Sequence, residues 1–334
     1  MAAAAASLLH RERLEACLSG APLDRPPVAL WRHFPVDDQT PVGLAAATAH
    51  FQREFDFDLI KVTPTSSFCV KDWGVEDRWT GNPEGTRDYT RRAVRQPEDW
   101  ARLRPLSPTA GNLGAQLECL RLVTKEFSPA TPVIQTIFSP MSQAKNLVGP
   151  EALLVHMRRS PDALHEGLRR ITETTLRFTE EALKTGIDGV FYAVQHAQYG
   201  LLSTGEYDEF CRRYDLQVLE AVHGRWLNML HLHGDAVMFD PAFDYPVQVV
   251  NWHDRETQPD LAGAQQRFTG AVCGGLRQWD TMVLGTPEQV RAEALDAIRQ
   301  TGGQRFILGT GCVLPTTAPY GNICAARMAV EEKH

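Results

Sequence analysis

Short apolar runs alternate with amphipathic stretches along most of the chain. Between the runs, apolar residues recur at spacings of three and four, which predicts helices. Two of these stretches open with Ser160-Pro161 and Thr286-Pro287, an N-cap residue followed by a proline suited to the first helical turn. The eight predicted strands are 28–31, 59–62, 133–138, 189–194, 227–232, 247–252, 270–273 and 305–308. The predicted helices are 43–56, 115–127, 161–185, 204–222, 287–300 and 321–332.

This alternation is typical of parallel strands joined by helical crossovers. Eight such units predict a single (β/α)8 TIM barrel, with its active site at the C-terminal ends of the strands. We expect residues 1–22 to form an N-terminal helical extension and residues 23–334 to form the barrel. An irregular insertion at about 64–110 would cover one mouth. A doubly wound open sheet is the alternative, but no GxGxxG follows the first strand and no GxxxxGK[ST] occurs, so we expect no nucleotide cofactor.

Composition narrows the class of protein. The chain has 334 residues and a formal net charge of −7, without basic clusters, which argues against nucleic acid as a partner. No apolar run of about 18 residues occurs, so we expect no membrane span and no secretory signal. The 7 cysteines are scattered and form no CxxC pair, which favours reduced thiols and a cytoplasmic protein. A homodimer is an oligomeric state that we keep open.

Polar residues gather where the predicted strands end. Five of the 11 histidines lie at these ends: His33, His196, His231, His233 and His253. Because the carboxyl ends of barrel strands meet at one mouth, we expect these side chains to converge.

A metal site is predicted from two of these strand ends. Residues two apart in a strand point the same way, so His231 and His233 can chelate one ion while Leu232 packs on the other face. Cys312 follows the last strand in a glycine-rich segment and offers the thiolate that zinc prefers. The fourth position falls to Asp254, His253 or Glu256, or is left for substrate. The alternative is a hydrogen-bonded histidine pair without metal.

Other strand-end residues are candidates for binding and catalysis. Arg32 would anchor an anionic substrate group through its planar guanidinium if it faces the mouth, and would otherwise form a surface ion pair. Gln195 and His196 would orient or protonate the substrate, or form a satisfied polar pair. The predicted substrate contacts are His33, Ser139, Asn251 and Asp254.

Three segments resemble the uroporphyrinogen decarboxylase family. Residues 25–32, RPPVALWR, resemble the family's opening segment. Residues 136–149, beginning TIFSP, resemble its third strand and following helix, and residues 311–323, GCVLPTTAPYGNI, resemble its closing segment. The resemblance extends in order over about residues 23–332, and it implies a single (β/α)8 barrel.

The resemblance implies two kinds of enzyme. Uroporphyrinogen decarboxylases need no cofactor, whereas the related zinc methyltransferases hold zinc with an H-x-C pair and a late cysteine. These methyltransferases include methylcobamide:coenzyme M methyltransferases and cobalamin-independent methionine synthase. In this comparison His231 matches the family histidine, His233 replaces the family cysteine, and Cys312 matches the late cysteine. Glu256 resembles the glutamate ligand of the methionine synthases.

The decarboxylase pattern is matched less well. Arg32 matches a family arginine, but residues 62–67, VTPTSS, hold no aspartate where decarboxylases carry one, and the late histidine is replaced by residues 312–315.

We therefore expect a zinc-dependent methyl- or alkyltransferase that activates a thiol and takes a small anionic substrate, with a corrinoid as a candidate methyl donor. A metal-free decarboxylase of a carboxylated ring compound is the first alternative. A non-catalytic protein that binds a corrinoid or another tetrapyrrole is the second.

Overall fold

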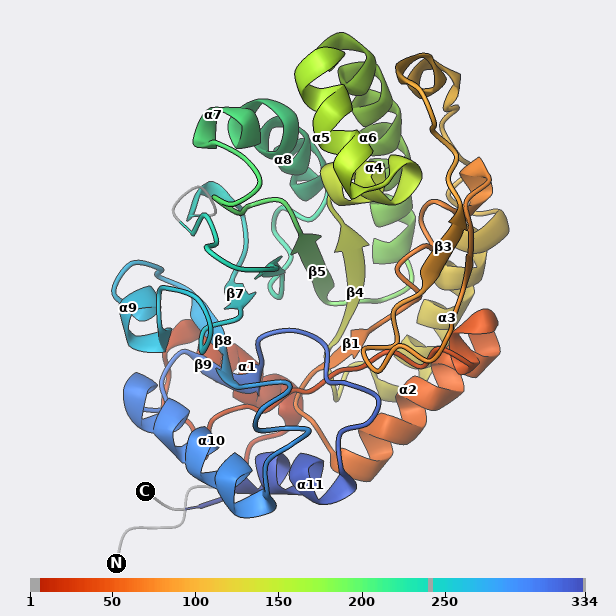
Figure 1. The fold of residues 1–334 in the computed structure, drawn as a ribbon. Helices are drawn as coiled ribbons and strands as arrows, with labels where there is room; N and C mark the ends of the chain where they lie inside the picture. Colours follow the sequence, from red (N-terminus) through yellow and green to blue (C-terminus); the bar gives the residue numbers. More distant parts are fainter. Residues whose placement is uncertain (1–6, 240–242, 333–334) are drawn as a thin grey trace, which may run out of the picture.

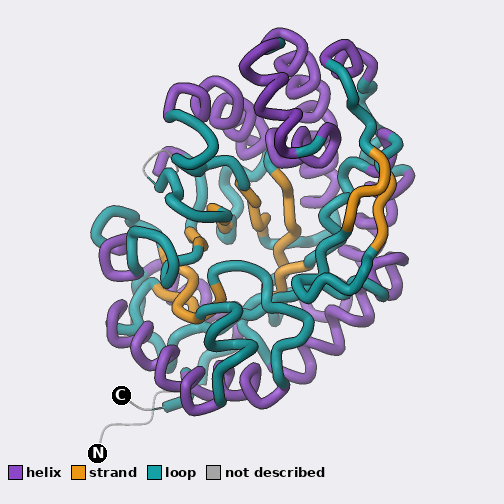
Figure 2. Tube along the Cα trace, in the orientation of Figure 1, coloured by secondary structure: helices purple, strands orange, loops and turns teal. Residues whose placement is uncertain are grey.

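Seven parallel strands form one curved sheet that is surrounded by helices (Figures 1 and 2). The computed structural model describes residues 7–239 and 243–332 of the chain. The strands of the sheet, in spatial order, are β1 (Ile60–Val62), β4 (Val133–Phe138), β5 (Gly189–Val194), β6 (Met229–Leu232), β7 (Val249–Trp252), β8 (Ala271–Leu276) and β9 (Phe306–Thr310). Two further strands, β2 (Glu76–Arg78) and β3 (Asp88–Arg91), form a separate antiparallel ribbon.

Helices alternate with these strands and lie outside the sheet (Figure 2). A π-helical turn, Asp208–Arg212, joins α7 to α8. Within the described ranges, no helix combines the length and the apolar character needed to cross a membrane. The helices are α1 (His10–Ser19), α2 (Pro41–Phe55), α3 (Gly111–Phe127), α4 (Pro140–Val148), α5 (Pro150–Arg159), α6 (Pro161–Leu183), α7 (Thr204–Tyr207), α8 (Arg213–Glu220), α9 (Leu261–Gln265), α10 (Pro287–Thr301) and α11 (Tyr320–Ala329).

The predicted α/β architecture is confirmed, but closure by an eighth strand is not. Segment 28–31 forms only an isolated parallel bridge, between Val28 and Leu308 of β9. On its other side, the N–H group of Asp58 donates to the carbonyl group of Val28 at 2.9 Å. Pro26 and Pro27 precede this segment and have no N–H group to donate, which limits the ladder that can form there.

The predicted helices correspond to helices of the structure, with shifted ends. The spacing of apolar residues does not predict α4 and α5, which follow β4 almost without a loop. Segment 64–110, predicted as an irregular insertion, contains the ribbon of β2 and β3 and short 3-10 turns.

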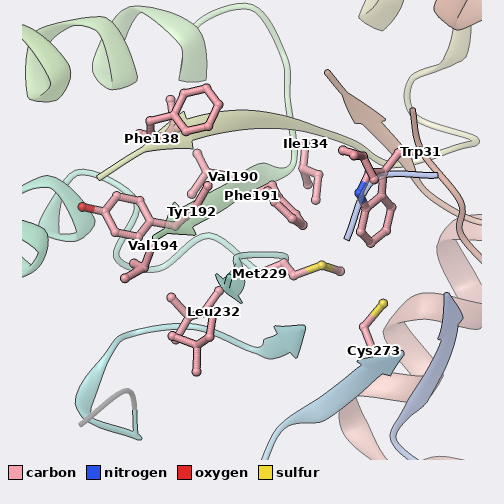
Figure 3. Close-up of a cluster of buried hydrophobic side chains, with 14 of the residues drawn as sticks. Trp31, Ile134, Phe138, Val190, Phe191, Tyr192, Val194, Met229, Leu232 and Cys273 are labelled. Atoms are coloured by element: carbon pink, nitrogen blue, oxygen red, sulfur yellow. The ribbon is translucent and has the colours of Figure 1, made fainter. Parts of the chain in front are cut away.

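Strand alternation divides the side chains of the sheet between two environments. All residues of β4 and β5 are buried, because one face of each strand packs on helices and the other faces the interior of the sheet. Figure 3 shows Phe191 of β5 close to Trp31, and their ring centroids are 5.3 Å apart in an edge-on arrangement. Val190, Tyr192 and Val194 alternate with it along the strand.

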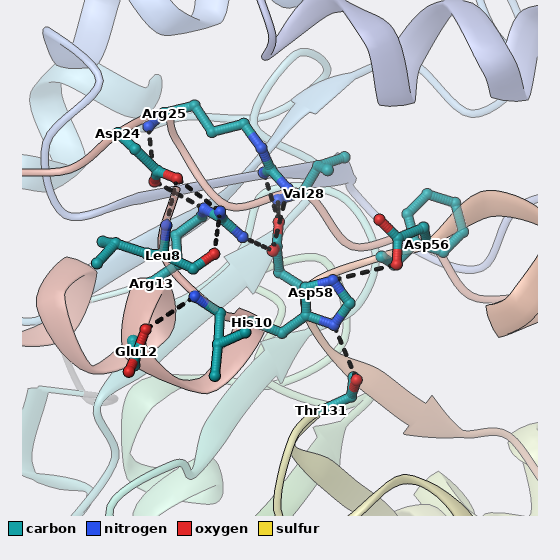
Figure 4. A network of polar contacts seen from close by, with 12 residues as sticks. Leu8, His10, Glu12, Arg13, Asp24, Arg25, Val28, Asp56, Asp58 and Thr131 are labelled. Atoms are coloured by element: carbon teal, nitrogen blue, oxygen red, sulfur yellow. Dashed lines mark hydrogen bonds and ion pairs between the residues drawn. The ribbon is translucent and has the colours of Figure 1, made fainter. Parts of the chain in front are cut away.

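A buried carboxylate ties the N-terminal residues to the sheet at the opposite end from the predicted site (Figure 4). Asp58, just before β1, accepts hydrogen bonds from Arg13 at 2.6 Å, from Arg25 at 2.7 Å and from the N–H group of Val28 at 2.8 Å. Arg13 also pairs with Asp24. Both arginines are buried, so their charges depend on these partners.

We predict that Asp58→Asn lowers the free energy of unfolding by about 3 kcal/mol, because it removes the charge that the two buried guanidinium groups share. Urea unfolding measures this loss. Glu76→Gln is the control: its exposed pair with Arg91 should contribute under about 1 kcal/mol. Equal effects of the two substitutions would contradict the prediction.

Candidate functional site

A cavity of about 450 Å³ opens where β1, β4, β5 and β6 end. Inward-facing residues of each strand line it at intervals of two, as strand alternation requires. From the strands and the residues that follow them these are Lys61, Thr63, Thr136, Phe138, Phe191, Ala193, Gln195, His231 and His233. The cavity therefore lies at the C-terminal ends of the strands, where the sequence places the chemistry.

His231 is held by its neighbour in the sheet. It is the register partner of Asn251 on β7, and its Nδ1 atom lies 2.7 Å from Oδ1 of Asn251. The amide nitrogen of Asn251 donates to the carbonyl groups of Cys273 and Thr310, each at 3.0 Å, which orients the amide. Its oxygen must then accept a hydrogen bond from the N–H group at Nδ1 of His231. The Nε2 lone pair of His231 is therefore free to bind a metal.

His233 and Cys312 complete a group of three metal-binding side chains. The Sγ atom of Cys312 lies 3.6 Å from Nδ1 of His233. Ligand atoms of His231, His233 and Cys312 all lie within 4.8 Å of one another. The structure thus brings together the three residues that the sequence predicts as metal ligands.

Gly311 permits this approach. A Cβ atom at Gly311 would lie 2.7 Å from the Cα atom of His253 and 3.0 Å from the carbonyl oxygen of Trp252. Any other residue would push the segment after β9 away from the end of β7 and carry Cys312 with it.

Burial keeps the histidines neutral in the metal-free protein. It lowers the pKa of His233 to about 3, with help from His253 and Lys145, and it lowers that of His231 well below 6.5. Burial raises the pKa of the Cys312 thiol to about 11. Neutral imidazoles bind metal directly, whereas the thiol must first lose its proton.

The candidates for a fourth ligand lie outside this group. Glu256 accepts a hydrogen bond from Nδ1 of His253 at 3.0 Å and is not brought to the three ligands. The His253 ring lies 5.4 Å from that of His233, and its buried Nε2 atom has no hydrogen-bond partner. Asp254 is turned toward β8, where it accepts a hydrogen bond from the N–H group of Gly275 at 3.0 Å.

Arg32 does not line the cavity. Its guanidinium group lies over the rings of Phe34 and Phe51, at 5.3 and 5.6 Å from their centroids, in a separate small pocket beside α2. Trp31 faces the cavity. Because successive side chains of an extended segment point to opposite sides, Arg32 faces away from the cavity.

The other predicted residues are divided between the cavity wall and the layer behind it. His33 and Gln195 line the cavity, and Gln195 accepts a hydrogen bond from Lys145 at 2.6 Å. His196 is buried outside the lining, and its Nδ1 atom has no hydrogen-bond partner. Ser139 caps α4, where its hydroxyl group accepts from the N–H group of Ser142 at 3.3 Å.

The sequence interpretation missed the cationic residues of the cavity. Lys61, Arg87, Arg92 and Lys145 all line it. For Lys61 a signal was available, because it shares its strand face with Thr63 and is a lone charge in an apolar run. Lys145 belongs to a helix that the spacing does not predict, and Arg87 and Arg92 belong to the irregular segment.

Comparisons with known proteins agree with this architecture. The chain is 21% identical over 331 residues to a methylcobamide:CoM methyltransferase of Methanosarcina acetivorans, covering 94% of this chain and 95% of that one. It is 25% identical over 241 residues to a uroporphyrinogen decarboxylase of Chlorobaculum parvum, covering 66% and 65%. A solved structure of a methyltransferase from Methanosarcina mazei superposes with a TM-score of 0.83 at 17% identity, covering 97% and 98%, and shows the same fold.

The sequence profile of uroporphyrinogen decarboxylase matches residues 9–333, which is nearly the whole chain. Relatives named as methyltransferases and relatives named as decarboxylases both match it, so these names identify a family of enzymes without identifying one reaction. The chain belongs to the uroporphyrinogen decarboxylase family.

Proposed function

We propose that this protein is a zinc-dependent transferase that passes a methyl or another alkyl group to a thiol. One observation carries the proposal: ligand atoms of His231, His233 and Cys312 lie within 4.8 Å of one another at the wall of a cavity of about 450 Å³. A relative that matches along the whole chain is named a methylcobamide:CoM methyltransferase, which supports this reaction class.

The three side chains fit zinc. Two neutral imidazoles and one thiolate are ligands that zinc prefers, and His231 has its Nε2 lone pair free because Asn251 binds the other nitrogen. Three protein ligands leave one position for a substrate, as catalytic zinc sites do. When bound, zinc supplies a Lewis acid that lowers the pKa of a thiol ligand.

The chain's own residues set the conditions for this chemistry. Cys312 would hold the metal as a thiolate, with its proton released to solvent when the metal binds. Phe191 stacks on His231 with ring centroids 5.1 Å apart, and together with Trp31 it forms the aromatic part of the cavity wall. Gln195, held by Lys145, presents a polar group just after the end of β5, the strand that carries Phe191.

The replacement of the family cysteine by His233 changes the charge of the proposed site. One thiolate instead of two leaves a zinc ion with a net charge of +1 rather than 0. A thiolate substrate would then neutralise the site instead of making it anionic, so His233 favours the binding of an anionic thiol.

Metal-free decarboxylation remains the second candidate, because relatives named uroporphyrinogen decarboxylase match the chain at 25% identity.

The direct test of methyl transfer incubates the protein with methylcobalamin and 2-mercaptoethanesulfonate and measures the methyl thioether by mass spectrometry. Thioether formation that stops on chelation and returns with zinc supports the proposal. No transfer by the zinc-loaded protein to this or any other thiol would contradict it.

We predict that Cys312→Ala lowers zinc affinity more than about 100-fold, because it removes the thiolate ligand. Zinc content by mass spectrometry, after dialysis against a graded series of chelator concentrations, measures the change. Cys324→Ala is the matched control, since Cys324 is also half-buried but lies on α11, outside the ligand group. Wild-type protein without zinc, or unchanged zinc in Cys312→Ala, would refute the metal site.

A second prediction concerns the residue that orients His231. Asn251→Ala should lower zinc affinity about 10- to 100-fold, because His231 loses the acceptor that fixes its tautomer. Asn322→Ala is the control: its buried amide also donates to two carbonyl groups, those of Met282 and Gly285, but touches no predicted ligand. Both variants should lose stability, and only Asn251→Ala should lose zinc. Equal zinc affinity in the two variants would show that Asn251 has a purely structural role.

A further inference from the structure

Two lysines line the cavity without a carboxylate partner. Lys61 is only 7% exposed, and its Nζ atom lies 4.3 Å from the ring centroid of Phe191. Lys145 donates to the neutral side chain of Gln195. Among the residues that the structure describes, no carboxylate forms an ion pair with either lysine.

Burial in the cavity wall makes the charged forms of Lys61 and Lys145 energetically unfavourable. Burial lowers the pKa of Lys61 to about 7, and burial together with Arg92 lowers that of Lys145 to about 8. Buried charges in proteins normally have partners. Cations that lack a carboxylate partner and line a cavity therefore point to a ligand that supplies the counter-charge.

Apart from Cys312, whose thiolate is the proposed zinc ligand, the other ionic groups of the cavity do not supply it. Glu84 is the single carboxylate among the described lining residues, and it accepts hydrogen bonds from Gln278 and Trp279, each at 3.2 Å. Arg87 pairs with Asp38 and Asp77. Arg92 donates to the carbonyl groups of Lys145 and Asn146 and adds a further positive charge near Lys145.

The two lysines act on different members of the ligand group. Lys61, on β1, lies close enough to Cys312 and His231 to shift their pKa values. Lys145, on α4, has the same effect on His233 and His196. The two positive charges therefore line the same cavity as the three predicted ligands and come from separate elements of the fold.

From this arrangement we propose that the cavity binds a small molecule with two anionic groups, one placed at Lys61 and the other at Lys145 beside Arg92. The substrate class is a dicarboxylate or a similar dianion. The inference rests on the proposed function only for the thiol that the same molecule would carry to the metal.

The test uses the full chain, with and without zinc, and ligands that contain no sulfur. Calorimetry measures the binding of dicarboxylates from malonate to adipate, each against the monocarboxylate of equal length. We expect one chain length to bind at least about tenfold more tightly than its monocarboxylate, through a second charge-assisted contact. Lys61→Met and Lys145→Met should each abolish that preference. Lys184→Met should not, because Lys184 is an exposed partner of Glu181 far from the cavity lining.

Melting temperature separates binding from folding. Removal of an unpartnered buried charge should leave the melting temperature equal or higher, and Lys61→Arg should keep both the charge and the preference. A wild-type protein without preference at any length, or a preference that survives both Met substitutions, would overturn the inference. If dicarboxylates bind as expected but no thiol accepts a methyl group, the anion site stands and the proposed function fails. If a thiol is methylated but no dianion is preferred, the proposed function stands and the anion site fails.

Discussion

The buried side-chain amide of Asn251 joins four strands at the mouth of the sheet. It belongs to β7, receives a hydrogen bond from His231 of β6, and donates to carbonyl groups of Cys273 on β8 and Thr310 on β9. Both of its N–H groups donate and its oxygen accepts, so a flipped amide would lose these hydrogen bonds. The tautomer of His231, and with it the direction of the free lone pair, depends on this amide.

The two ends of the sheet differ in how well their buried polar groups are paired. Lys61, a buried charge that lies over the ring of Phe191 without a carboxylate partner among the described residues, and the Nε2 atom of His253, which has no hydrogen-bond partner there, lie at the C-terminal ends of the strands. The opposite end holds the paired charges of Arg13, Arg25 and Asp58 (Figure 4). This division is expected of a barrel-like enzyme, in which one end contributes stability and the other contributes chemistry.

Strand periodicity explains how far the sequence could predict this site. It placed His231 and His233 on one face correctly, because a period of two needs no tertiary information. The approach of Cys312 depended on Gly311, which the sequence also displays. The sequence predicts an anion-binding Arg32 only if it faces the mouth, since it follows an apolar run. In the structure Trp31 faces the cavity, which turns Arg32 to the opposite face. The position of Lys145 depends on helix packing, which no local pattern encodes. The contact between His253 and Glu256 spans only three residues, but its formation in place of a fourth metal ligand depends on the turn that follows β7.

We propose that two imidazoles and one thiolate hold zinc at this mouth. X-ray absorption at the zinc edge, on zinc-loaded protein purified without a nickel column, tests it most directly. The account predicts one sulfur ligand at about 2.3 Å and nitrogen ligands at about 2.0 Å, with the sulfur replaced in Cys312→Ala. A first shell made only of nitrogen and oxygen in the wild-type protein would contradict the account.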